Sequence, residues 1–285
     1  MTKKIIFNSD GFGLSKASNR GVLDAYKFGI LKSASIVANG LEFKDAIENI
    51  VPQCSDLNIG IHLNVTTGKS ICNDLTNLTD SDNNFNNTYA QLLLKSYNPK
   101  ETDFFAQLER EFRRQIETIL SKTTVTHIDS YSQIHSIPKI FELVCKLAKE
   151  YEIPTIITHT EKFYVIPEIK KYLTTQFLTN ILKNRILYLF SFINKKNLSK
   201  YNLQTNNYLI GTLYDSLMNS LVVSYGINAN NFNDTIIEVR IHPCRYNDGT
   251  IDKYFDELLL IKNNKLKNKL IDMGYEITNY VKKEL

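Results

Sequence analysis

The sequence predicts an α/β fold built on one mainly parallel sheet, either open or closed into a barrel. Short runs of β-branched residues alternate with longer segments of helical periodicity along most of the chain. The strand candidates, such as IIF at 5–7 and TIITHT at 155–160, lack regular polar alternation. That lack is typical of strands buried on both faces. A chain of 285 residues is long enough for one such domain.

Six segments carry the strand pattern, and helical patterns lie between them. No Pro/Gly/Ser linker divides the chain, so one domain over residues 1–285 is predicted, and the Asn/Asp-rich residues 73–88 are expected to form an exposed loop. The strands are predicted at Lys4–Ser9, Ala34–Ala38, Asn58–Asn64, Val125–Tyr131, Pro154–Thr160 and Ile236–His242. Helices are predicted at Ser15–Phe28, Leu41–Ile50, Phe104–Leu120, Ile140–Tyr151 and Phe255–Met273.

The segment 161–210 fits this alternation least well, because it shows helical patterns but no clear strand. It is a candidate insertion, flap or interface segment. Residues 161–200 contain eight Lys and Arg against two Glu, a net charge of +6, while the whole chain carries +4. This basic stretch surrounds ILYLFSFI at 186–193, which is compatible with peripheral contact with an anionic membrane or with a homodimer interface, although the pattern is more typical of the following alternative. The alternative is a solvated basic face over an ordinary core helix.

The composition excludes several classes of protein. With 43% apolar and 22% charged residues, the chain resembles a soluble globular protein. A net charge of +4 is too small to indicate a nucleic-acid partner. The apolar runs are too short for a transmembrane segment, and we recognise no secretory signal. Four cysteines without close spacing are expected to be reduced thiols, so the predicted location is cytoplasmic.

Polar residues gather at the ends of the predicted strands, where parallel α/β folds place their reactive groups. The first strand runs into NSDGFG at 8–13, the third contains GIHLN at 60–64, and the fourth continues as THIDSYSQIH at 126–135. If the fourth strand stays extended, alternate residues of it share one face. The sequence therefore predicts a common site formed by Asn8 and Asp10, by His62 and Asn64, by His127, Asp129, Tyr131 and His135, and by His242 at the end of the last strand.

Each of these residues also has a purely structural explanation. A lone histidine at a strand end is more often a hydrogen-bonded core residue than a ligand. Asp10 could cap the following helix or hold a turn, and the two glycines after it could simply allow a sharp bend. Their joint placement at strand ends, rather than over helices and loops, favours a shared site.

Several motifs, taken together and in order, resemble the YdjC-like (ChbG/HpnK) family of carbohydrate deacetylases. They are the opening NSDGFGLSKASNRGVLDAYKFGILKSASIVANG, GIHLNVTTGK, THIDSYSQIHSIP, GTLYDSLM and IEVRIHP, and they cover nearly the whole chain. The resemblance implies a distorted (β/α) barrel of the polysaccharide-deacetylase type. It also implies removal of acetyl groups from N-acetylated sugars, a divalent metal such as zinc or magnesium held by one Asp and two His, and no nucleotide cofactor.

The resemblance assigns roles to particular positions, and this chain departs from the family at two of them. The opening motif of the family normally reads Asp-Asp-Phe-Gly, with the first Asp as base and the second as metal ligand; here these positions are Asp10 and Gly11. His62 retains one metal-binding histidine, whereas Tyr131 stands where the second is expected, and His242 is expected to act as acid. Two of the three ligands are thus replaced, and the possible substitutes are Asp129, His127, His135 and Asp10 itself, which would be a much poorer base as a ligand.

Three functions are compatible with this pattern. The first is a carbohydrate deacetylase with a rebuilt metal site, in which Asp10 is the base and His242 the acid. The second is a metal-independent acid–base enzyme acting on a sugar, with Tyr131 donating to an oxyanion. The third is a non-catalytic glycan-binding pseudoenzyme. The partner is a small sugar or a glycan, free or lipid-linked, and the residues expected to contact it are Asn8, Asn64, Asp129, Tyr131 and His135.

Overall fold

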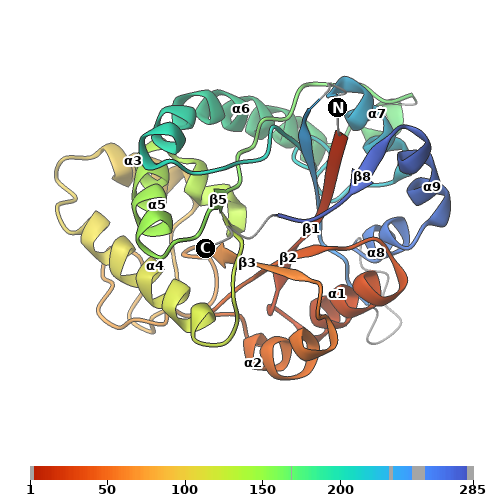
Figure 1. Cartoon of the computed structure of the whole chain (residues 1–285). Helices are drawn as coiled ribbons and strands as arrows, with labels where there is room; N and C mark the ends of the chain where they lie inside the picture. The colour runs from red at the N-terminus through yellow and green to blue at the C-terminus, as the bar shows by residue number, and fades with distance from the viewer. Residues whose placement is uncertain (1–2, 168, 231–233, 246–253, 281–285) are drawn as a thin grey trace.

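Parallel strands form one curled sheet at the centre of the molecule, and helices lie around it (Figure 1). The computed structural model describes residues 3–167, 169–230, 234–245 and 254–280. The spatial order of the strands is β5-β4-β3-β2-β1-β7-β6, with β8 also paired to β1, and every strand pair described is parallel. The strands are β1 (Lys3–Phe12), β2 (Ser33–Ile36), β3 (Asn58–Leu63), β4 (His127–Ser130), β5 (Thr155–Ile156), β6 (Tyr208–Ile210), β7 (Ile236–Ile241) and β8 (Tyr275–Ile277).

The sheet curls until its two ends approach each other. Thr155 of β5 forms a parallel bridge to Gln204, shortly before β6. Further along, the backbone N–H of Leu209 donates to the carbonyl oxygen of Thr160 at 3.1 Å. Because β5 has only two residues, these isolated contacts replace a continuous ladder at the closure. The result is a distorted barrel, which confirms the predicted fold class.

Helices pack against the outer face of the sheet, and their apolar sides form the core with the strands. The 17-residue helix at 104–120 has the predicted bounds, and Phe112 and Ile116 on its inner side are fully buried. The helix after β1 begins at a capping box, in which the Ser15 hydroxyl accepts from the Ser18 N–H at 3.1 Å. The helices are α1 (Lys16–Phe28), α2 (Phe43–Asp45), α3 (Tyr89–Tyr97), α4 (Phe104–Leu120), α5 (Pro138–Glu150), α6 (Thr175–Tyr201), α7 (Ser220–Ala229), α8 (Phe255–Ile261) and α9 (Asn264–Asp272).

The structure differs from the sequence prediction mainly in its short elements. Strands β6 and β8 have three residues each, too few to show a period, and the sequence predicts neither. The helix predicted at 255–273 is divided into α8 and α9, because the Asn263 side chain caps the second helix by accepting from the Lys265 N–H at 2.9 Å. Within 161–210, the structure places the 27-residue helix α6 and then β6.

The inside of the barrel changes character along its length. At the amino ends of the strands, Ile6, Ile157 and Leu209 form a small apolar cluster with Tyr280. The Tyr280 hydroxyl donates to the carboxylate of Glu238 there. Toward the carboxyl ends the interior becomes polar, and the predicted site lies at that end. In the described residues, no helix combines the length and apolar character needed to span a membrane.

Candidate functional site

A cavity of about 340 Å³ opens at the carboxyl ends of the central strands. Four of the predicted site residues line it, namely Asp10, His62, Tyr131 and His242. They come from four separate segments of the sequence, and the parallel sheet brings them together because the carboxyl ends of its strands meet at one edge. Lys183, Asp215 and Tyr254 also line the cavity.

Asp10 reaches the cavity through an irregularity in β1. The pairing register with β2 shifts between Ser9 and Phe12, and Gly11 adopts a φ of +77° within this bulge. The Asp10 carboxylate is 6% exposed and accepts a hydrogen bond from Asn8 Nδ2 at 3.0 Å, while Arg240 Nε lies 3.8 Å from its other oxygen. Burial and the nearby negative charge of Asp129 raise the pKa of Asp10 to about 6, although the surrounding cations oppose the shift.

His62 and Asp129 form a buried pair beside Asp10. Nδ1 of His62 lies 2.6 Å from Oδ1 of Asp129, whose other oxygen accepts from the Ser35 hydroxyl at 2.7 Å and from Asn8 at 3.3 Å. Burial alone would raise the pKa of Asp129, but His62 and these hydrogen bonds hold it well below its usual range. Burial would lower the pKa of His62, yet the carboxylates of Asp129 and Asp10 outweigh burial and raise it. Because Nδ1 is engaged, Nε2 is the ring nitrogen left for a ligand.

Asp10, His62 and Asp129 could hold a metal ion, because one ligand atom from each lies within 4.8 Å of the others. Two carboxylates and an imidazole are suitable ligands for a divalent cation, and a cation would relieve the repulsion between the buried carboxylates. Asp129 already accepts three hydrogen bonds, which leaves fewer lone pairs for a metal. Neither Gly11 nor Tyr131 adds a strong ligand, and the Tyr131 ring meets that of His62 edge-on with centroids 6.1 Å apart.

His127 and His135 lie outside this cluster. The His127 nitrogens contact the hydroxyls of Thr126 and Ser35 at 2.9 and 3.0 Å. Its ring packs directly over Gly60, where an added Cβ would lie 2.1 Å from Nε2. The His135 nitrogens contact Ser130 Oγ at 2.5 Å and the Ile157 carbonyl at 2.9 Å. Burial lowers the pKa of each histidine to about 4, so both are neutral at physiological pH.

The two predicted asparagines, Asn8 and Asn64, do not line the cavity, and their side chains form hydrogen bonds with neighbouring residues instead. Asn8 is fully buried beneath the cluster, where it donates to Asp10 and Asp129. The side-chain oxygen of Asn64 accepts from the N–H groups of Thr66 and Thr67 at 3.1 and 3.2 Å, which fixes the loop after β3. Both contacts orient the site from outside.

His242 follows β7 and faces the same cavity as Asp10. Its backbone N–H donates to Glu257 Oε2 at 2.5 Å, and its Nδ1 lies 3.4 Å from the same oxygen. Burial alone would lower the pKa of this imidazole. The carboxylates of Glu257, Asp215 and Asp10 outweigh burial and raise the pKa above the ordinary value. His242 therefore carries a proton more readily than a free histidine does.

A second layer of charged residues was not visible from the sequence. Arg240 is 2% exposed and donates to the Gly211 carbonyl at 2.7 Å, and its Nη2 lies 3.5 Å from Asp215 Oδ2. Lys183 of α6 also approaches Asp215, at 3.8 Å. Burial and the charge of Arg240 lower the pKa of Lys183 to about 8. The motifs GTLYDSLM and IEVRIHP contain Asp215 and Arg240, but nothing in the sequence around Lys183 or Glu257 indicates that they face a site.

Glu161 fixes the loop that carries Asp215. It is fully buried, and its carboxylate accepts from the backbone N–H groups of Gly211, Thr212 and Leu213 at 3.0, 2.8 and 2.8 Å. The Asn184 side chain of α6 donates to it as well, at 3.0 Å. This carboxylate ties α6 to the loop after β6.

Replacing this carboxylate in Glu161→Gln should lower the free energy of unfolding by about 2–4 kcal/mol, because the amide turns a donor toward N–H groups that need an acceptor. Urea titration followed by circular dichroism would measure the change. Glu276→Gln on the exposed side of β8 is the matched control and should leave the midpoint within error. Equal midpoints for the two variants would contradict the anchoring role of Glu161.

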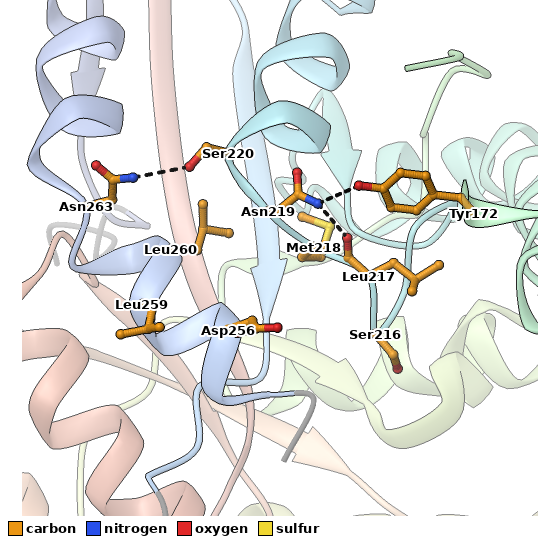
Figure 2. Close-up of a pocket in the computed structure, with 10 residues that line it drawn as sticks. All are labelled: Tyr172, Ser216, Leu217, Met218, Asn219, Ser220, Asp256, Leu259, Leu260 and Asn263. Carbon is orange, nitrogen blue, oxygen red and sulfur yellow. Dashed lines mark hydrogen bonds between the residues drawn. The ribbon is translucent and has the colours of Figure 1, made fainter. Parts of the chain in front are cut away.

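A groove of about 420 Å³ lies near this cavity (Figure 2). They share no lining residue, but the same two segments reach both: Asp215 and Tyr254 line the cavity, and Ser216 and Asp256 line the groove. In Figure 2 the Tyr172 hydroxyl meets the Asn219 side chain at 3.0 Å, and the Asp256 carboxyl group points toward the loop at 216–219. The groove combines an aromatic ring, apolar side chains and polar groups along one surface.

Comparisons with known proteins agree with this architecture. A family model described as "YdjC-like protein" matches residues 4–270. A carbohydrate deacetylase of Clostridium beijerinckii is 37% identical over 152 residues, which cover 53% of this chain and 58% of that protein. A carbohydrate deacetylase of Oceanobacillus iheyensis is 35% identical over 168 residues, covering 58% of this chain and 69% of its own length. The match thus spans little more than half of the first relative.

A solved structure from Enterococcus faecalis, described as a candidate cellobiose-phosphate cleavage protein, superposes with a TM-score of 0.72. It has 19% sequence identity, and the superposition covers 98% of each chain. At that identity the likeness concerns the fold alone. The family match over residues 4–270 is what assigns the chain. The chain belongs to the YdjC-like family.

Proposed function

We propose that this protein removes an acetyl group from an N-acetylated sugar, with Asp10 as general base and His242 as general acid. The observation that carries this proposal is that both side chains line one cavity at the carboxyl ends of the strands. The relatives named carbohydrate deacetylase support the reaction and the sugar substrate.

The two side chains have the protonation states that the reaction needs. With a pKa of about 6, Asp10 is ionised at neutral pH and can take a proton from the attacking water. The water oxygen then bonds to the amide carbon. His242, whose pKa is raised, gives its proton to the nitrogen as the C–N bond breaks, which releases acetate and the free amine. Asp129 keeps His62 oriented toward the reacting groups.

A divalent cation, zinc or magnesium, is proposed to be held by His62, Asp129 and one carboxylate oxygen of Asp10, which leaves the other Asp10 oxygen to act as the base. Such an ion would polarise the amide carbonyl and lower the pKa of a water molecule. His62 must be neutral to coordinate it, and the raised pKa of His62 means that a proton competes with the metal. Metal affinity should therefore fall as the pH is lowered through neutrality.

The groove beside the cavity extends the proposal to the rest of the substrate. Its Tyr172 ring and the polar groups of Asn219 and Asp256 are the kinds of side chain that contact sugar rings and hydroxyls. A glycan longer than one sugar could place its acetylated unit in the cavity and its neighbour in the groove. In this proposal the groove residues contact the neighbouring sugar, and Tyr131 contacts the acetylated one.

Glycan binding without catalysis is the second candidate function. The observation that favours it is the absence of ligands at Gly11 and Tyr131, combined with the three hydrogen bonds that already occupy Asp129. In that case Asp10 and His242 would contact the sugar without cleaving it.

We expect chelator-treated protein to release little acetate from a panel of N-acetylated mono- and disaccharides, and added zinc or magnesium to restore release. Metal content and acetate would be measured on the same samples. His62→Ala should lower the rate of metal-dependent acetate release by at least about a hundredfold, because it removes the imidazole ligand. The control is Lys69→Ala, because Lys69 lies on an exposed loop. His159→Ala would not serve, because His159 is buried.

The three outcomes separate the candidate functions. Acetate that depends on metal supports the proposal as stated. Acetate that persists in excess chelator and is lost in Asp10→Asn assigns a metal-independent acid–base mechanism. A sugar that raises the melting temperature without any acetate being released assigns the glycan-binding function.

A further inference from the structure

Helix α6 exposes a band of large apolar side chains, although it also buries Phe177, Leu187 and Leu198. It runs along one edge of the molecule (Figure 1). Leu178, Leu182 and Leu189 are 60, 64 and 59% exposed, although leucines on a surface helix normally face the core. Together with neighbours at helical spacing they form one band along four turns. We call this band the outer stripe; it consists of Leu178, Leu182, Ile186, Leu189, Phe192 and Ile193.

The inner side of α6 buries polar residues among apolar ones, and the polar residues hold it in place. Asn184 donates to the anchoring Glu161 at 3.0 Å, and Asn180 donates to the Asp215 carbonyl at 3.2 Å. Farther along, Asn194 donates to the Ser136 carbonyl at 2.8 Å, and Ser191 Oγ accepts from the His159 N–H at 3.0 Å. These buried contacts fix which side of the helix faces inward. The outer stripe therefore cannot turn inward without breaking them.

The charge around the stripe has one sign. Residues 169–201 contain no Asp or Glu, and Lys170, Arg185, Lys195 and Lys196 are exposed along the same helix and its approach. The Lys195 ammonium lies 4.9 Å from the Phe192 ring centroid, so cation and stripe share one surface. An apolar band with interspersed cations is the pattern of helices that lie flat on anionic lipid.

We propose that the outer stripe docks on an anionic lipid surface. Self-association through the stripe is disfavoured, because a two-fold dimer would bring the cations of both copies to one interface with no acidic residue on either helix to offset them. An anionic bilayer supplies the opposite charge and accepts the apolar side chains. The helix would lie on the surface, consistent with its being too polar to span it. This inference does not depend on the reaction proposed above.

The docking surface and the catalytic cavity are joined by the same helix. Lys183, toward the inner side of α6, lines the cavity, while the outer stripe lies about one helix diameter away. A protein docked in this way would work close to the lipid headgroups. The basic segment 161–200 would then hold the protein at the lipid surface in addition to its part in the fold.

Flotation of the full-length protein with vesicles tests the docking. We expect binding to phosphatidylcholine vesicles that contain phosphatidylserine, weak binding to phosphatidylcholine alone, and loss of binding at high salt. Leu182→Gln with Leu189→Gln should weaken binding about tenfold or more by removing apolar contacts. Lys195→Gln with Lys196→Gln should weaken it about twenty-five-fold, at about fivefold per cation.

Leu94→Gln is the matched control, because Leu94 is 71% exposed on a different helix, α3, and its loss should leave vesicle binding unchanged. Circular dichroism would establish that each variant is folded. Absence of vesicle binding by the unaltered protein would overturn the proposal. A concentration-dependent dimer in light scattering that is dissociated by the stripe substitutions would also overturn it. The outer stripe would then bind a second copy of the chain and not lipid.

Discussion

Asp10→Asn should lower acetate release about a thousandfold and, at the same time, make the folded protein more stable at neutral pH. The loss of activity follows from the loss of the general base, which typically contributes a factor of this order. Asn is nearly isosteric with Asp and can still accept the hydrogen bond from Asn8, so the geometry of β1 should be kept. Acetate release at saturating substrate measures the first effect.

The gain in stability follows from the sign of the pKa shift. The pKa of Asp10 rises from its ordinary 3.8 to about 6 in the folded protein, so folding disfavours the charged form. Between these values the folded state holds a proton that the unfolded state has lost, and stability falls as the pH rises through this window. Well above pH 6 the full penalty applies, and removing the charge should stabilise the protein by about 3 kcal/mol.

The pH dependence provides the check. Urea unfolding in the presence of a chelator should show the Asp10→Asn protein to be more stable at pH 8 and equal to the unaltered protein below pH 4. Asp56→Asn, on an exposed loop, is the control and should change neither activity nor stability. An Asp10→Asn protein that is inactive and less stable at pH 8 would indicate that the charge of Asp10 is needed by the fold, against the role proposed.

The residues at strand ends were predictable because a parallel sheet leaves little freedom there. Once β1, β3, β4 and β7 are recognised, their carboxyl ends must meet, and Asp10, His62, Asp129 and His242 come together without further information. The fate of the residues after β4 was not predictable in this way. That strand ends at Ser130, and Ser132 and Gln133 adopt φ values of 53° and 58°, so the alternation of a strand no longer decides where the following side chains lie.

The contributions of helices were hidden for a different reason. Apolar residues occur on both sides of α6, with Phe177, Leu187 and Leu198 buried and the outer stripe exposed, so the sequence does not show which side faces the protein. Only the contacts of Asn180, Asn184 and Asn194 fix its orientation, and with it the place of Lys183 in the cavity. Glu257, 15 residues beyond His242, is found only from the fold.

Restoring both family ligands, with Gly11→Asp and Tyr131→His, should raise the affinity for zinc by at least about a hundredfold. Position 11 lines the cavity, and an added Cβ would meet only the Leu14 Cδ1 at 3.2 Å, the far end of a flexible side chain. The new imidazole would replace a ring that already faces His62. Calorimetric titration with zinc measures the gain directly.

The backbone cost of this variant can be measured separately. Gly11 has a φ of +77°, which an L-residue adopts at a cost of about 1 kcal/mol, although Asp tolerates it better than most. Gly274→Asp is the matched control, because its φ is +79°, no atom lies within 4 Å of the added Cβ, and it stands outside the site. Without metal, Gly274→Asp should lose only this backbone term, and the double variant should lose more, because its new carboxylate also stands near Asp10 and Asp129.

Only the restored site should recover that stability when zinc is added, because binding to the folded state alone stabilises it in proportion to the affinity gained. A third carboxylate beside Asp10 and Asp129 also increases the repulsion in the metal-free protein, which makes the recovery larger. If the zinc affinity and the melting temperature stay unchanged in the double variant, the bulge in β1 directs the new Asp side chain at position 11 away from His62. In that case the glycine at position 11 differs from the family's Asp in two ways: it lacks a metal ligand, and it allows β1 to follow a different backbone path.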